Sequence, residues 1–122
     1  MDEIDVLACL TALSQQTRLR AFRLLVAHEP DGIAAGGIAG LVDVPQNTLS
    51  THLAILSHCG LIRGERRSRS IVYHADLQRF RQLLAFLLQD CCGGKPEICA
   101  PVLDGITSGC ASRLKPERLD RD

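Results

Sequence analysis

The chain has 122 residues, of which 46% are hydrophobic and 3% aromatic, and its 14 basic and 14 acidic residues cancel. This length favours a single domain with a modest core of aliphatic residues, and the neutral balance excludes a surface that is basic throughout, so any surface for nucleic acid must be local. No apolar run reaches the roughly 20 residues of a membrane span, and the acidic start is unlike a signal peptide. We therefore expect a cytoplasmic protein with reduced thiols.

The first half of the chain predicts four helices. Apolar spacing gives the first helix one face made of five residues: Ile4, Val6, Leu7, Leu10 and Leu13. Ser14 is the expected N-cap of a second helix, and the turn at 30–32 follows it. A short third helix is expected over 33–42. The fourth should run from Gln46 to His58 and end at Gly60, with three leucines facing inward: Leu49, Leu53 and Leu56.

The second half predicts a hairpin and one more long helix. Residues 61–63 and 71–74 have the composition of short strands, and the polar segment 64–70 joins them. A broad apolar stripe then predicts a helix over 77–90. Residues 100–106 suit a further short helix, and the charged end of the chain is expected to be disordered. The predicted fold is mainly α with a small β-hairpin: a winged helix-turn-helix of five or six helices and a two-stranded wing.

Two groups of polar residues suit DNA. In a winged helix-turn-helix the second helix of the pair enters the major groove. The solvent face of that helix offers small polar side chains for base edges and phosphates: Gln46, Asn47, Thr48, Ser50 and Thr51. The hairpin loop adds cations for phosphates or the minor groove: Arg66, Arg67 and Arg69. Either group alone is an ordinary solvated surface, but the two in tandem favour binding to double-stranded DNA.

The segment from Ser50 to Ile62 carries a family likeness. It reads Ser-Thr-His-Leu-Ala-Ile-Leu-Ser-His-Cys-Gly-Leu-Ile and resembles the recognition-helix signature of the ArsR/SmtB repressors, Ser-x-His-Leu-x-x-Leu-x-x-x-Gly-Leu followed by an aliphatic residue. Residues 10–20 also resemble the opening of that family's second helix. The resemblance covers about residues 4–90. It implies a homodimeric repressor of a metal or metalloid resistance operon, not an enzyme, with the first and last long helices at the dimer interface. It gives His52 a packing and hydrogen-bonding role.

Three cysteines lie within nine residues after the last long helix: Cys91, Cys92 and Cys99. Gly93-Gly94 and Pro96 between them allow the chain to wrap one thiophilic ion. The inducer positions that the resemblance implies elsewhere are empty, since residues 36–42 contain no cysteine and residues 77–89 contain neither Asp nor His. The trio is similar to the C-terminal arsenite site of some members of the family. The resemblance therefore implies As(III), or Sb(III) of the same geometry, as an inducer held by three thiolates.

Two other uses of this trio stay open. Zinc prefers four ligands, so it would need one more from Asp90, Glu97 or Cys110. A disulfide within the trio would instead make a redox switch. A thiol reductase is disfavoured because the sequence has no Cys-x-x-Cys motif. Cys9 and Cys59 are each expected to be small buried hydrophobic residues. The predicted organisation is a DNA-binding and dimerisation domain over 1–90 and an inducer-binding tail over 91–122.

Overall fold

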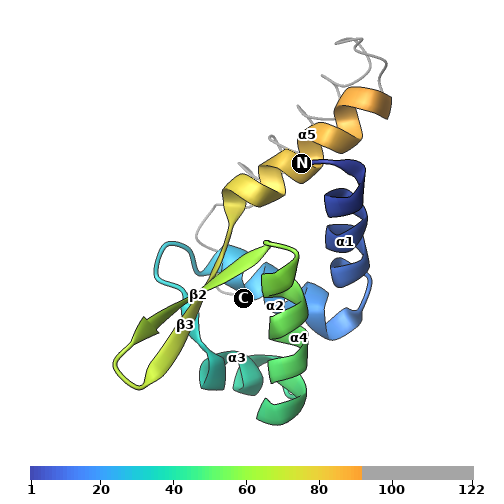
Figure 1. Ribbon diagram of the computed structural model, residues 1–122. Coiled ribbons are helices and arrows are strands. Elements are labelled where there is room, and N and C mark those ends of the chain that lie inside the picture. Colours follow the sequence, from blue (N-terminus) through green and yellow to red (C-terminus); the bar gives the residue numbers. More distant parts are fainter. Residues whose placement is uncertain (92–122) are drawn as a thin grey trace, which may run out of the picture. The chain divides into compact units, whose positions relative to one another are not determined.

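The computed structural model describes residues 1–91, with side-chain surroundings up to residue 88. The described chain forms five helices and three strands (Figure 1): α1 (Glu3–Leu13), α2 (Gln16–Ala27), β1 (Ile33–Ala34), α3 (Ala35–Val42), α4 (Gln46–His58), β2 (Ile62–Arg67), β3 (Ser70–Ala75) and α5 (Leu77–Cys91). Residues 1–84 form one compact unit, and residue 85 begins a second. The mainly helical winged helix-turn-helix fold is confirmed.

The sheet has one strand more than the sequence predicted. Its order is β1-β3-β2 with antiparallel pairing, and Ile33 and Ala34 lie opposite Tyr73 and Val72 of β3. We had placed Ile33 and Ala34 at the start of the third helix, which was wrong because a two-residue strand has no period to detect. The wing strands are also longer than predicted. They leave a turn of only Ser68 and Arg69, in which Ser68 has a φ of 56°.

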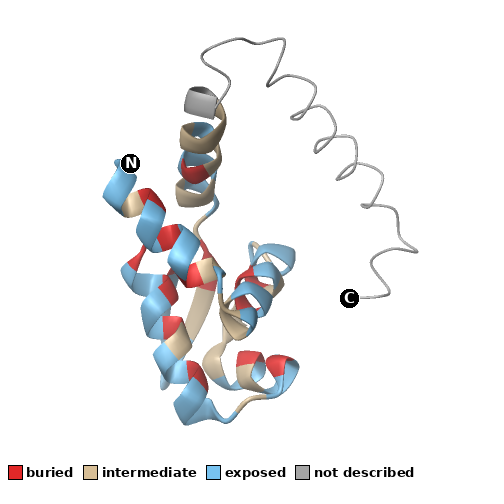
Figure 2. Ribbon diagram, turned by 90° about the vertical axis from the view of Figure 1, so that its right-hand side faces the viewer, coloured by how far each residue is buried: buried red, intermediate tan, exposed pale blue. Residues whose placement is uncertain are grey.

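The core lies between the inner sides of the helices and the sheet (Figure 2). The predicted inward face of α4 is confirmed, because Leu49, Leu53 and Leu56 are all buried. Phe22 of α2 packs against Phe80 of α5 with ring centroids 5.2 Å apart and ring planes at 57°. Burying a large apolar side chain such as Phe22, which is 3% exposed, contributes about 1.5–3 kcal/mol.

Helix α1 differs from its prediction in the face that it buries. Its buried residues are Val6, Cys9 and Ala12. Ile4 and Leu7, which the sequence places on the same apolar face as Val6, are 77% and 57% exposed. The reason is that α1 is apolar on nearly every side, so its spacing does not select one face. The outer side of α1 is therefore an uncovered apolar surface within the single chain.

The boundary between α1 and α2 also corrects the sequence analysis. Ser14 is the C-cap of α1, where its hydroxyl donates to the carbonyl of Thr11 at 2.7 Å. The N-cap of α2 is Gln15, whose side-chain oxygen accepts from the backbone N–H of Arg18 at 2.9 Å. Only two residues separate the helices, so a polar residue there can serve either end.

Candidate nucleic-acid interface

Helix α4 is placed by a tight turn after α3. Asp43 adopts a left-handed conformation with a φ of 59°, and Pro45 is the N-cap of α4. No side chain makes a capping hydrogen bond at Pro45. Of the first backbone N–H groups of α4, that of Thr48 donates to the side chain of Asn47, and the helix end carries a partial positive charge without a side-chain cap from Pro45. This end of α4 is also where the predicted DNA contacts begin.

All five predicted contacts on α4 are exposed: Gln46, Asn47, Thr48, Ser50 and Thr51. Two of them are already engaged with the helix. The Ser50 hydroxyl donates to the carbonyl of Gln46 at 3.0 Å, and the Asn47 side-chain oxygen accepts from the N–H of Thr48 at 2.9 Å. Ser50 is thereby left mainly as an acceptor, whereas Asn47 keeps both amide N–H donors. The face offers mixed donors and acceptors, as base edges require.

The wing presents the three predicted arginines on exposed positions, but they are not equivalent. The Arg67 Nε donates to the Glu65 carboxylate at 2.8 Å, and both side chains are exposed. This hydrogen bond and the charge of Arg67 lower the pKa of Glu65. Within the described residues, Arg66 and Arg69 have no carboxylate partner. They are therefore the wing cations most available to phosphates.

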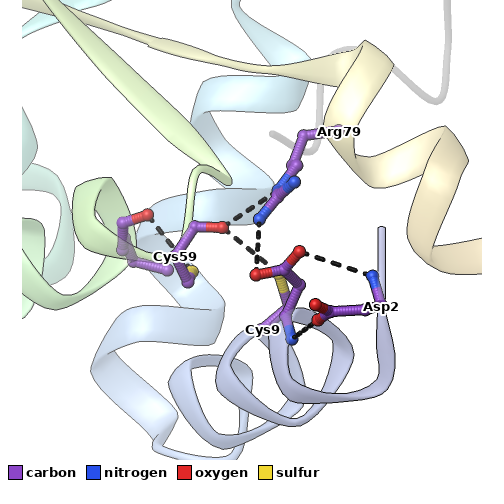
Figure 3. Close-up of polar contacts among 6 residues, drawn as sticks. Asp2, Cys9, Cys59 and Arg79 are labelled. Atoms are coloured by element: carbon purple, nitrogen blue, oxygen red, sulfur yellow. Dashed lines mark hydrogen bonds and ion pairs between the residues drawn. The ribbon is translucent and has the colours of Figure 1, made fainter.

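Arg79 connects the end of α4 to α1 and α5 (Figure 3). From α5, its Nε donates to the carbonyl of Cys59, the C-cap of α4, at 3.1 Å. One of its terminal nitrogens lies 3.7 Å from the carboxylate of Asp5, and Asp5 takes part in the capping box of α1 with Asp2. Sequence reasoning missed Arg79, because nothing in its local pattern reveals a contact with residues 20 and 74 positions away.

Cys9 and Cys59 are buried, as predicted. The Cys9 thiol donates to the carbonyl of Cys59 at 3.4 Å, and the Cys59 thiol donates to that of Leu56 at 3.3 Å. Burial, together with the charge and the thiol of Cys59, raises the pKa of Cys9 to about 11. A protonated thiol is a poor ligand for a metal. Among the described residues, no three His, Cys, Asp or Glu side chains gather to hold a metal ion.

The predicted cysteine trio lies at and beyond the limit of the description. Cys91 is the last residue of α5. Its side chain, together with Cys92 and Cys99, lies outside the described residues. The site on these three thiols stays a prediction.

A shallow apolar groove of about 580 Å³ separates α1 from α4. Its walls are formed by Leu7, Ala8, Thr11, Ala12, Thr51, Ala54, Ile55, His58 and Cys59. The groove continues the exposed apolar side of α1 toward the recognition helix. Exposed apolar area of this kind commonly receives another protein surface.

Comparisons with known proteins agree with this fold. Residues 13–65 match the family model of a helix-turn-helix domain, and no curated protein sequence matches the chain. The crystal structure of an ArsR family transcriptional regulator, RHA00566, has a TM-score of 0.64 at 18% identity over 74% of this chain and 90% of that one. None of the described helices is long and apolar enough to cross a membrane.

Two further solved structures are similar at higher identity. One is the homodimeric winged helix-turn-helix DNA-binding domain of Mb0332 from Mycobacterium bovis, with a TM-score of 0.58 and 25% identity over 70% of this chain and 79% of that one. The other is a possible transcriptional regulator for arsenical resistance, with a TM-score of 0.57 and 25% identity over 78% of this chain and 93% of that one. The chain thus has the fold of DNA-binding transcription regulators.

Proposed function

We propose that the chain is a homodimeric ArsR-type repressor of an arsenic-resistance operon. It binds operator DNA when free of ligand and is released by As(III), or by Sb(III), bound to Cys91, Cys92 and Cys99. The observation that carries the DNA-binding part is the pairing of an exposed polar face on α4 with unpaired arginines at the wing tip. The likeness to a possible regulator for arsenical resistance supports the choice of operon.

The dimer part rests on the outer side of α1. Ile4, Leu7 and Leu10 are exposed there. A second copy would cover these residues, and the Mycobacterium bovis relative is described as a homodimer. We propose that α1 and α5 form the interface. Two recognition helices held about one turn of DNA apart, roughly 34 Å, would then read a palindromic site.

The inducer part rests on elimination and on chemistry. The other two cysteines of the described chain, Cys9 and Cys59, are buried thiols that serve the core. A trivalent metalloid takes three soft sulfur ligands in a pyramid, which the trio supplies without a fourth group. Zinc would need another ligand. Of the four remaining cysteines, Cys110 lies eleven residues beyond Cys99, so we propose the three clustered thiols that begin at the end of α5 as the site.

Arg79 could couple the proposed inducer site to the recognition helix α4. Helix α5 carries Arg79 in its first turn and ends at Cys91. An ion that reorganises the end of α5 would disturb the hydrogen bond from Arg79 to the carbonyl of Cys59 and, through it, the end of α4. A coupling of about 1–3 kcal/mol would change operator affinity by roughly 5–150-fold.

The test uses a duplex that the wild-type protein enriches from a random library. Arsenite should release the wild-type protein from this duplex but should leave Cys99→Ser bound, because two thiolates do not complete the pyramid. Cys110→Ser is the matched control and should respond as the wild type does. Release of Cys99→Ser at the wild-type arsenite concentration would refute the three-thiolate site while leaving DNA binding intact.

A further inference from the structure

His52 and Arg18 meet across two helices of the helix-turn-helix. Arg18 lies in α2, and its Nε donates to the carbonyl of Ala12 at 2.7 Å. A terminal nitrogen of the same guanidinium lies 3.2 Å from Nδ1 of His52 in α4. The first contact holds Arg18 against the end of α1, so the second holds the His52 ring in one orientation.

The chemistry of the guanidinium fixes the proton on His52. Arginine stays charged and has no acceptor, so it must be the donor and Nδ1 must accept. A ring that accepts at Nδ1 is neutral and carries its proton on Nε2. His74 shows the opposite case, because its Nδ1 lies 3.2 Å from the carboxylate of Glu29, which only accepts. The two rings therefore hold opposite nitrogens as donors.

The Nε2 donor of His52 is also accessible. In His74 the Nε2 atom is buried and has no hydrogen-bond partner. The Nε2 atom of half-buried His52 also has no hydrogen-bond partner among the described residues. Unlike Nε2 of His74, however, it is not among the fully buried atoms that lack a partner. Its N–H group is therefore not fully buried. It lies on the recognition helix, next to the exposed Thr51.

We propose that the Nε2–H of His52 donates to a phosphate oxygen of the operator backbone, and that Arg18 is the residue that positions it. This inference rests on the proposed DNA binding. A phosphate is the expected acceptor because base edges are read by the first residues of a recognition helix, whereas His52 lies in the second turn of α4. Phosphate contacts of this kind set the orientation of the protein on the duplex.

A matched pair of substitutions separates this role from packing. The amide of His52→Asn falls near Nδ1, so this variant keeps the acceptor for Arg18 and loses the donor to DNA. The amide of His52→Gln falls near Nε2 and keeps that donor. We expect the first to weaken binding to the enriched duplex about tenfold and the second by less than threefold. Wild-type affinity in His52→Asn, or an equal loss in both variants, would overturn the proposal.

Three further measurements complete the test. Nitrogen-15 NMR of the imidazole in the free protein should show a protonated Nε2 and a bare Nδ1, and the reverse pattern would overturn the tautomer. Arg18→Gln should weaken binding without changing its salt dependence. A fall of about one in the slope of log affinity against log salt would make Arg18 itself the phosphate contact. His28→Asn, on an exposed histidine of α2's C-cap, is the control and should bind normally.

Failure of this inference differs from failure of DNA binding. If the wild type enriches no duplex, the proposed function fails. If the wild type binds and loses affinity on removal of Arg66 and Arg69, but His52→Asn binds normally, only the role of His52 fails. The unfolding midpoint of each variant shows whether a loss of binding reflects a loss of fold, and the NMR pattern tests the tautomer without any substitution.

Discussion

The outer side of α1 and the outer side of α4 are both exposed, but their chemistry is opposite. The first presents Ile4 and Leu7, and the second presents Gln46, Asn47 and Thr51. Water satisfies the polar face at no cost, whereas it leaves the apolar face unfavourably hydrated. Exposure alone therefore does not identify a function. The kind of side chain exposed is the basis on which we propose a different partner for each surface: a second copy of the chain on α1, and DNA on α4.

The largest effect is expected from a charge on the apolar face. Leu7→Glu would place a carboxylate in the proposed dimer interface, where its desolvation should raise the dimer dissociation constant at least about 100-fold. Sedimentation equilibrium measures this change directly. Leu41→Glu is the matched control, since Leu41 is 58% exposed on α3 against 57% for Leu7. If both variants remain dimeric, the outer side of α1 is not the interface.

The next largest effect concerns the arginines of the wing. Arg66→Gln with Arg69→Gln should lower the slope of log affinity against log salt by about 2, since each lost phosphate contact accounts for about 0.9. Arg67→Gln should have less effect, because Arg67 is paired with Glu65. Arg23→Gln, on an exposed residue of α2, is the control for the loss of a positive charge away from the wing. Equal slopes in all variants would exclude the wing from the interface.

The difference between these regions also shows what the sequence can predict. Helix α4 has polar residues on one side and leucines on the other, so its bounds and its inward face were both predicted correctly. Helix α1 has apolar residues on both sides, so the sequence revealed the helix but not which face the core would take. The contacts of Arg79 with Cys59 and of Arg18 with His52 join residues that are far apart in the sequence. Patterns of neighbouring residues cannot predict such contacts.

A smaller effect, on stability, is expected at Arg79, which contacts both α1 and the end of α4. Arg79→Met would remove the charged donor to the carbonyl of Cys59 and the ion pair with Asp5. Unfolding in urea should show a loss of about 1–3 kcal/mol, because the carbonyl of buried Cys59 would lose its charged donor and keep only the weak donor of the Cys9 thiol. Arg81→Met, on an exposed residue of the same helix, should cost less than about 0.5 kcal/mol. Equal costs in the two variants would mean that Arg79 does not hold α1, α4 and α5 together.

The smallest effect tests whether Cys9 belongs to the core that supports both surfaces. Its pKa is raised from 9.0 to about 11 in the folded chain. As pH rises through 9, the thiol of the unfolded chain ionises first, so stability is complete below pH 9 and is lost toward pH 11. The expected loss is about 1 kcal/mol at pH 10.

Urea unfolding at pH 8 and pH 10, under reducing conditions, measures this loss. Cys9→Ala should remove that part of the pH dependence, while other groups that titrate in this range affect both proteins alike. An unchanged pH dependence in Cys9→Ala would mean that the Cys9 thiol ionises as readily in the folded chain as in the unfolded one. Cys9 would then ionise like an ordinary thiol, and a raised pKa could no longer be given as a reason against Cys9 as a metalloid ligand. A lost pH dependence would mean that Cys9 stays a neutral core residue, which agrees with our proposal that the inducer binds the thiols that begin at Cys91.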